Sequence, residues 1–80
     1  MKIPRDLSGS DLIKILIQKL EYKVIHQEGS HVILETNIPS HQRIAIPDHK
    51  FLRIGTLNAI LRSVSNHKQM SKEDLVRLLD

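Results

Sequence analysis

Hydrophobic positions near the start of the chain recur with the period of a helix. Ser8, followed three residues later by Asp11, resembles a capping box in which Asp takes the place of Glu. The apolar residues that follow form a broad stripe on one helix face. They are Leu12, Ile13, Leu16, Ile17 and Leu20. We therefore predict a helix over residues 10–21.

The pattern then changes to three short segments rich in valine, isoleucine and leucine. They cover residues 22–28, 31–36 and 42–46, and each has the length and composition of a strand. Gly29-Ser30 suits a two-residue hairpin turn between the first two segments. Pro47 ends the third segment, because proline lacks the N–H that a strand ladder needs. The three segments predict an antiparallel meander.

A second helical pattern begins near Gly55-Thr56, either of which can cap the helix, with apolar residues at positions 57, 60, 61 and 64. Residues 65–68 interrupt this pattern. Ser71 and Asp74 then form a second capping box before a short last helix. The predicted order is α-β-β-β-α-α, an α+β fold in a single domain over residues 1–80.

The hairpin turn also predicts which residues share a face of the sheet, because side chains alternate along a strand. With Gly29-Ser30 at the turn, Glu28 pairs with His31. The predicted open face carries Tyr22, Val24, His26, Glu28, His31, Ile33 and Glu35, with Val24 opposite Glu35. The predicted buried face carries Ile25, Val32, Leu34, Ile44 and Ile46. This parity sets Arg43 opposite Glu35 and brings His31 level with Pro47.

Composition excludes several classes of function. The chain has 80 residues, no cysteine and a net charge of +3, so it has no disulfide, no thiolate nucleophile and no cysteine zinc site. A chain this short cannot enclose a large cofactor cleft. The charge alone leaves open a nucleic-acid binder or a basic surface that only maintains solubility. Because Tyr22 and Phe51 are the two benzene rings, a surface that stacks several bases is not expected.

The sequence predicts neither a membrane span nor a secretion signal. The longest apolar-rich stretch, residues 12–20, is interrupted by Lys14, Gln18 and Lys19 and is too short to cross a bilayer. Residues 1–6 include three charged side chains instead of an apolar core. These features and the absence of cysteine agree with a cytoplasmic protein.

Histidine is the best candidate for chemistry in a chain without cysteine, since its ordinary pKa lies near neutral pH. The predicted open face and its edge hold His26, His31, His41 and Arg43, with His49 and Lys50 close by. Glu28, opposite His31, can orient the imidazole and stabilise its charged form. A surface histidine on a strand is more often only solvated, so both interpretations stay open. The spacing of the histidines matches no metal motif, and no metal site is predicted.

Three segments of the chain resemble the HicA toxins of bacterial toxin–antitoxin pairs. They are Gln27-Glu28-Gly29-Ser30-His31, Ile46-Pro47-Asp48-His49-Lys50 and Ile54-Gly55-Thr56-Leu57 with Ile60-Leu61. The Gly-Ser-His triplet alone is weak, but the three segments at these distances are fairly specific. The resemblance runs from Leu7 to Leu79. It departs at Glu21-Tyr22, where the family commonly has Gly followed by Phe, and Tyr keeps the aromatic body.

The resemblance implies a double-stranded-RNA-binding-like fold, α-β-β-β-α, and a ribosome-independent endoribonuclease that cleaves mRNA. The histidine of the Gly-Ser-His motif is catalytic in this family, and it corresponds to His31. The implied partner is a HicB-like antitoxin that binds the toxin and masks this residue. His49 falls where the family often has a histidine. No cofactor is implied.

Such a reaction needs no metal, because RNA carries its own nucleophile, the 2′-hydroxyl. We expect His31 to act as general base, or as acid in a single-histidine scheme, with His49 and Glu28 as possible assisting groups. The candidate phosphate ligands are Gly29, Ser30, Arg43 and Lys50. Two alternatives stay open. One is a non-catalytic RNA-binding module of the same fold. The other is a protein-interaction domain with Val24 and Ile33 in its partner patch.

Overall fold

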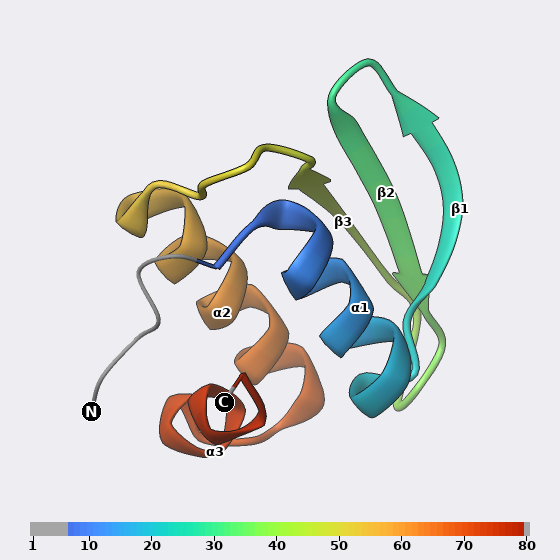
Figure 1. The fold of residues 1–80 in the computed structure, drawn as a ribbon. Coiled ribbons are helices and arrows are strands. Elements are labelled where there is room, and N and C mark those ends of the chain that lie inside the picture. The colour runs from blue at the N-terminus through green and yellow to red at the C-terminus, as the bar shows by residue number, and fades with distance from the viewer. Residues whose placement is uncertain (1–6, 80) are drawn as a thin grey trace.

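The computed structural model describes residues 7–79 (Figure 1). Its elements are α1 (Gly9–Leu20), β1 (Lys23–Glu28), β2 (His31–Thr36), β3 (Gln42–Pro47), α2 (Ile54–Lys68) and α3 (Lys72–Leu78). The strands form one antiparallel sheet in the order β1-β2-β3. The predicted α+β fold is therefore confirmed, with the α-β-β-β-α order of a double-stranded-RNA-binding-like domain and a short extra C-terminal helix. The prediction that residues 1–6 form no secretion signal concerns residues that lie outside the described part of the chain.

The helices cover one face of the sheet, and its other face is open (Figure 1). The fully buried apolar side chains between the two layers are Leu12, Leu16, Leu34, Ile46, Leu57, Leu61, Val64 and Leu75. Both α1 and α2 contact β3, whereas all six residues of β1 are exposed. β1 is thus an edge strand that the helices leave uncovered. For this reason the prediction that Ile25 is buried is wrong, and its side chain is 37% exposed.

The predicted turn at Gly29-Ser30 is confirmed, and Glu28 pairs with His31 across it. Gly29 has a φ of +57°, a left-handed conformation that glycine adopts without steric penalty. The pairing of β2 with β3 also follows the prediction, with His31 level with Pro47 and Arg43 opposite Glu35. This register brings the start of β2 beside the end of β3.

A β-bulge interrupts the first half of β1, between Val24 and His26, so Val24 pairs with Leu34 and not with Glu35 as predicted. The extra residue reverses the alternation of faces at the start of the strand. Tyr22, predicted on the open face, is therefore buried, with 2% of its surface exposed. Its hydroxyl donates a hydrogen bond of 2.5 Å to the side-chain carbonyl of Gln42.

The predicted capping box begins α1. The Ser8 hydroxyl accepts a hydrogen bond from the Asp11 N–H at 3.0 Å, and the Asp11 carboxylate accepts one from the Ser8 N–H at 3.4 Å. The helix ends at Leu20, one residue before the predicted end. Glu21 takes a left-handed conformation with φ of +61°, which terminates the helix.

α2 starts at Ile54, slightly earlier than predicted. Arg53 occupies the N-cap position, and no side chain makes a capping hydrogen bond there. The prediction that Gly55 or Thr56 caps this helix is therefore wrong. The N-terminal end of α2 directly follows the loop that connects it to β3.

α2 also continues through residues 65–68, where the sequence predicts a break. Ser65 is buried, and its hydroxyl donates to the Arg62 carbonyl at 3.1 Å, which satisfies the polar group without ending the helix. Ser71 then caps α3 as predicted, accepting from the Asp74 N–H at 3.0 Å.

No helix within residues 7–79 combines the length and apolar character needed to cross a membrane.

Candidate active site

The five histidines are spread over the molecule and differ in their partners. His26, His41 and His67 each contact a protein acceptor. Within residues 7–79, the ring nitrogens of His31 and His49 make no such contact, and both side chains are exposed. In that same part of the chain, no three His, Cys, Asp or Glu side chains converge to hold a metal ion. His31 and His49 are therefore the imidazoles available to an external ligand.

His31 is the first residue of β2, immediately after the hairpin turn. The turn projects away from the helices (Figure 1). Two backbone N–H groups, those of Gly29 and Ser30, lie at its tip, and Gln27 steadies it by donating its side-chain amide to the Gly29 carbonyl at 3.2 Å. An extended strand after a tight turn thus presents the His31 imidazole at an accessible edge.

Backbone hydrogen bonds hold the loop of residues 48–53, which carries His49 and Lys50, against this turn. The Asp48 N–H donates to the Ser30 carbonyl at 2.6 Å, and the Gly9 N–H donates to the His49 carbonyl at 2.9 Å. The loop is thus fastened both to the hairpin and to the start of α1. The structure therefore brings Gly29, Ser30 and His31 together with the loop that carries His49 and Lys50, as the strand register predicts.

Gly9 is a supporting residue that the sequence reasoning missed. A Cβ atom on Gly9 would lie 2.0 Å from the Pro47 carbonyl oxygen and 3.0 Å from the Asp48 Cα. Only glycine permits this approach of α1 to the end of β3. The available signal was a glycine at the first position of a helix, where its poor helix propensity calls for another reason.

Glu28 pairs with His31 in the backbone ladder, but its carboxylate contacts a different histidine. The Glu28 Oε1 lies 3.1 Å from the His26 Nε2, and both side chains are well exposed. Glu28 thus lies at the His31 end of the hairpin without a direct contact to the His31 ring.

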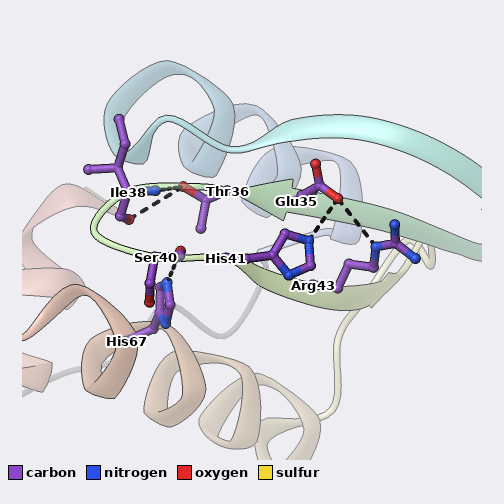
Figure 2. Close-up of polar contacts among 7 residues, drawn as sticks. All are labelled: Glu35, Thr36, Ile38, Ser40, His41, Arg43 and His67. Atoms are coloured by element: carbon purple, nitrogen blue, oxygen red, sulfur yellow. Dashed lines mark hydrogen bonds and ion pairs between the residues drawn. The ribbon is translucent and has the colours of Figure 1, made fainter.

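Arg43 lies at the other end of the sheet, paired with Glu35 (Figure 2). One oxygen of the Glu35 carboxylate accepts from His41 Nε2 at 3.0 Å and from Arg43 Nε at 3.3 Å. These contacts, that of His41 first, hold the pKa of Glu35 below its usual range. Glu35 is four residues beyond His31 along β2, a separation of about 13 Å at the usual rise of a strand. The structure thus separates Arg43 from His31.

The C-terminal end of α2 fastens the loop between β2 and β3. His67 Nε2 donates to the Ser40 carbonyl at 2.7 Å (Figure 2). The Lys68 ammonium donates to the Thr36 hydroxyl at 2.9 Å and to the Ile38 carbonyl at 2.5 Å. Burial lowers the pKa of Lys68. These side chains stabilise the fold at the end of the sheet remote from His31.

A hollow of about 580 Å³ lies over the sheet. It is lined by Ile25, His26, Glu28, Ile33, Arg43, Ile44 and Ala45. His31 is not among the lining residues. Of the two apolar residues predicted in a partner patch on the open face, Ile33 lines the hollow. The placement of Val24 on that face is wrong, because the bulge pairs Val24 with the buried Leu34, although Val24 is 50% exposed at the edge of the sheet.

One comparison with known proteins connects this arrangement to a family. The family model described as the HicA toxin of bacterial toxin–antitoxin systems matches residues 9–65, which is more than half of the chain. The match includes Gly9, the hairpin turn, His31 and the 48–53 loop, and it ends before α3. No curated protein and no solved structure matches the chain. The chain belongs to the HicA toxin family of bacterial toxin–antitoxin systems.

Proposed function

We propose that this toxin is an endoribonuclease that cleaves mRNA in the bacterial cytoplasm, with His31 as its catalytic residue and no metal. The observation that carries the proposal is an exposed imidazole without a protein partner, placed at the Gly-Ser-His turn of a chain in a toxin family. An imidazole is suited to proton transfer near neutral pH. The hairpin turn that carries His31 projects away from the helices (Figure 1).

The proposed reaction uses the 2′-hydroxyl of the RNA as nucleophile. His31 accepts the proton of this hydroxyl while the 2′-oxygen forms a bond to the adjacent phosphorus. The bond from phosphorus to the 5′-oxygen breaks, and that oxygen takes a proton, for which His49 is the candidate donor. The products are a 2′,3′-cyclic phosphate and a 5′-hydroxyl end. No electrons are transferred, and no cofactor enters the balance.

Several groups near His31 can support the developing charge on the phosphate. The candidates are the backbone N–H groups of Gly29 and Ser30, which directly precede His31, and the ammonium of Lys50, on the loop fastened to that turn. Glu28 is the candidate assisting carboxylate, and in this role it would exchange its contact with His26 for one with His31. Arg43 is then a more distant phosphate contact that serves a longer stretch of RNA.

The proposed partner is a HicB-like antitoxin that covers His31 and so blocks access of RNA. Membership in a toxin–antitoxin family supports a protein partner in general. An antitoxin on the hairpin edge would leave the opposite, helical side of the molecule free.

Cleavage of a labelled RNA in excess EDTA tests the catalytic proposal. We expect purified wild-type protein to cut the RNA to products with 2′,3′-cyclic phosphate ends, and His31→Ala to be slower by about a hundredfold or more, the usual contribution of general acid–base catalysis. His41→Ala is the matched control, because it removes another exposed sheet histidine at the remote end, and it should retain activity.

Three outcomes would each remove a part of the proposal. Equal cleavage by wild type and His31→Ala would exclude His31 as the catalyst. Loss of cleavage in EDTA would exclude a metal-free mechanism. Intact RNA with the wild type would leave the non-catalytic RNA-binding module or the protein-interaction domain as the function.

A further inference from the structure

Phe51 is an exposed ring in a protein that has few rings. The chain contains one tyrosine, one phenylalanine and no tryptophan. Tyr22 is 2% exposed, whereas Phe51 is 62% exposed, the highest fraction among the exposed large hydrophobic side chains. A single exposed apolar residue is ordinary by itself, so its surroundings decide what it can do.

Two cations flank this ring in the sequence, and both are exposed. The Lys50 Nζ lies 5.9 Å from the centroid of the Phe51 ring, and Arg53 follows two residues later. The ion pairs within residues 7–79 are His26–Glu28, His41–Glu35, Arg43–Glu35 and Arg77–Asp74. In that part of the chain, Lys50 and Arg53 thus have no carboxylate partner and can bind external anions.

The backbone beneath the ring is fixed on both sides. Leu52, the next residue, is 7% exposed, and its N–H donates to the Leu7 carbonyl at 3.3 Å. On the other side, the His49 carbonyl accepts from the Gly9 N–H at 2.9 Å. Because the backbone is already held, binding of a ligand to Phe51 would order the side chain and not the loop.

The same loop starts at the His31 turn, where the Asp48 N–H donates to the Ser30 carbonyl. Phe51 lies three residues after Asp48, so the chain separates them by at most about 11 Å. In Figure 1 the loop leaves β3 and passes the start of α1 on its way to α2. A strand of RNA with a phosphate at His31 could follow this loop to the ring within a few nucleotides.

We propose that Phe51 is a base-stacking residue for single-stranded RNA, and that Lys50 and Arg53 contact the phosphates on either side of the stacked base. An exposed ring between two free cations matches the alternation of base and phosphate along a strand. Duplex RNA does not fit, because its paired bases stay stacked on one another. The inference rests on the proposed function and specifies its substrate as single-stranded and read with little sequence preference.

Binding of a short, fluorescein-labelled single-stranded RNA in a His31→Ala background tests this inference without cleavage. We expect Phe51→Leu, which keeps apolar bulk but loses the ring, to raise Kd by about 5-fold to 150-fold, the usual effect of one stacking platform. In the same background, Phe51→Tyr, which keeps the ring, should have almost the same Kd as His31→Ala alone. Ile38→Ala is the matched control, because Ile38 is 54% exposed in the loop between β2 and β3, and it should leave Kd unchanged.

A second readout uses RNA that contains one 2-aminopurine, whose fluorescence falls when the base stacks. Fluorescence should fall on binding to His31→Ala and fall less with the additional Phe51→Leu change. An unchanged Kd and an unchanged fluorescence response with Phe51→Leu would overturn the inference. Weaker binding of the antitoxin with no effect on RNA would also overturn it and assign Phe51 to the protein partner.

The two proposals fail in different ways. If Phe51→Leu binds RNA normally but wild type still cleaves RNA and His31→Ala does not, the stacking inference alone is wrong. If wild type leaves RNA intact while Phe51→Leu weakens binding, the catalytic proposal alone is wrong. If wild type leaves RNA intact and neither wild type nor His31→Ala binds RNA, both are wrong.

Discussion

Tyr22 shows how the surroundings of one residue control its chemistry. Its ring is buried beneath the C-terminal end of α2, and the Lys68 Nζ lies 5.0 Å from the ring centroid. Its hydroxyl donates to Gln42. Burial raises the pKa of Tyr22 to about 12, because the charged phenolate loses its hydration inside the protein.

Titration of Tyr22 should therefore depend on folding. The absorbance of phenolate reports this residue alone, because the chain has one tyrosine. We expect a midpoint near 12 in the folded protein and near 10 in urea. The raised pKa means that the folded state keeps its proton longer, so this contribution to stability is full below pH 10 and is lost as pH rises toward 12.

The control for this prediction is Tyr22→Phe, which cannot ionise. Its free energy of unfolding should fall less steeply than that of wild type between pH 10 and 12. Lys68 also titrates in alkaline solution, and it is present in both proteins. A midpoint near 10 for folded wild type would show that the phenol is hydrated.

At the scale of elements, the contact of α1 with the end of β3 determines where the candidate site lies. Gly9 approaches the backbone of Pro47 and Asp48 more closely than any side chain permits. Asp48 in turn contacts Ser30. The start of α1, the end of β3 and the hairpin turn thus form one connected support for His31 and for the loop of residues 48–53.

Replacement of Gly9 by alanine should disturb this support. We expect Gly9→Ala to lower the free energy of unfolding by about 1–3 kcal/mol, as overpacking does in other proteins, and to reduce RNA cleavage. The Cβ would meet rigid backbone atoms, which cannot move aside as a flexible side chain could. Urea denaturation measures the first effect.

Gly55→Ala is the matched control, since it makes the same change in the first turn of another helix, at a position with no atom within 4 Å of the new Cβ. Alanine favours a helix over glycine by about 1 kcal/mol, so this variant should be as stable as wild type or more stable. Equal effects of the two substitutions would contradict the close approach of Gly9.

At the scale of the whole molecule, most lysines and arginines of residues 7–79 have no carboxylate partner, and they lie on several elements. The net charge of +3 is modest, and Arg43 on the open sheet face already has a carboxylate partner in Glu35. Lys50 and Arg53 have none among the described residues. Because these two lie on the loop fastened to the hairpin turn, we expect them to contribute more to RNA binding near His31 than the paired Arg43 does.

The salt dependence of RNA binding tests this distribution. For single strands, each phosphate contact contributes about 0.7 to the slope of log K against log salt concentration. In a His31→Ala background, Lys50→Gln should reduce the slope by about that amount. Arg43→Gln should change it less, because its guanidinium is already engaged by Glu35. Equal reductions by both variants would place the RNA across the sheet instead.

Local signals were sufficient to predict most of the fold and the position of His31. The capping box at Ser8 predicted α1, and the Gly29-Ser30 turn predicted the register that sets His31 beside Pro47. These features depend on hydrogen bonds and backbone conformations within a few residues of the chain. The resemblance to a toxin family supplied the proposed role of His31, which the pattern of histidines alone left open.

Other features depended on contacts between distant parts of the chain. The bulge in β1 buried Tyr22, and packing carried α2 through Ser65. Glu28 contacts His26, and Arg43 is held by Glu35. Sequence spacing allows more than one backbone pairing or side-chain contact at each of these positions. The packing of the elements determines which of them forms.

The sequence by itself determined the order of elements, the hairpin turn and the face that carries His31, because these follow from periodicity and turn geometry. Only the tertiary structure decided that Gly9 and the loop of residues 48–53 support the turn, and that Phe51 remains exposed while Tyr22 is buried. The physical reason is that close backbone approach and burial depend on which elements pack together, and residues far apart in sequence make those contacts.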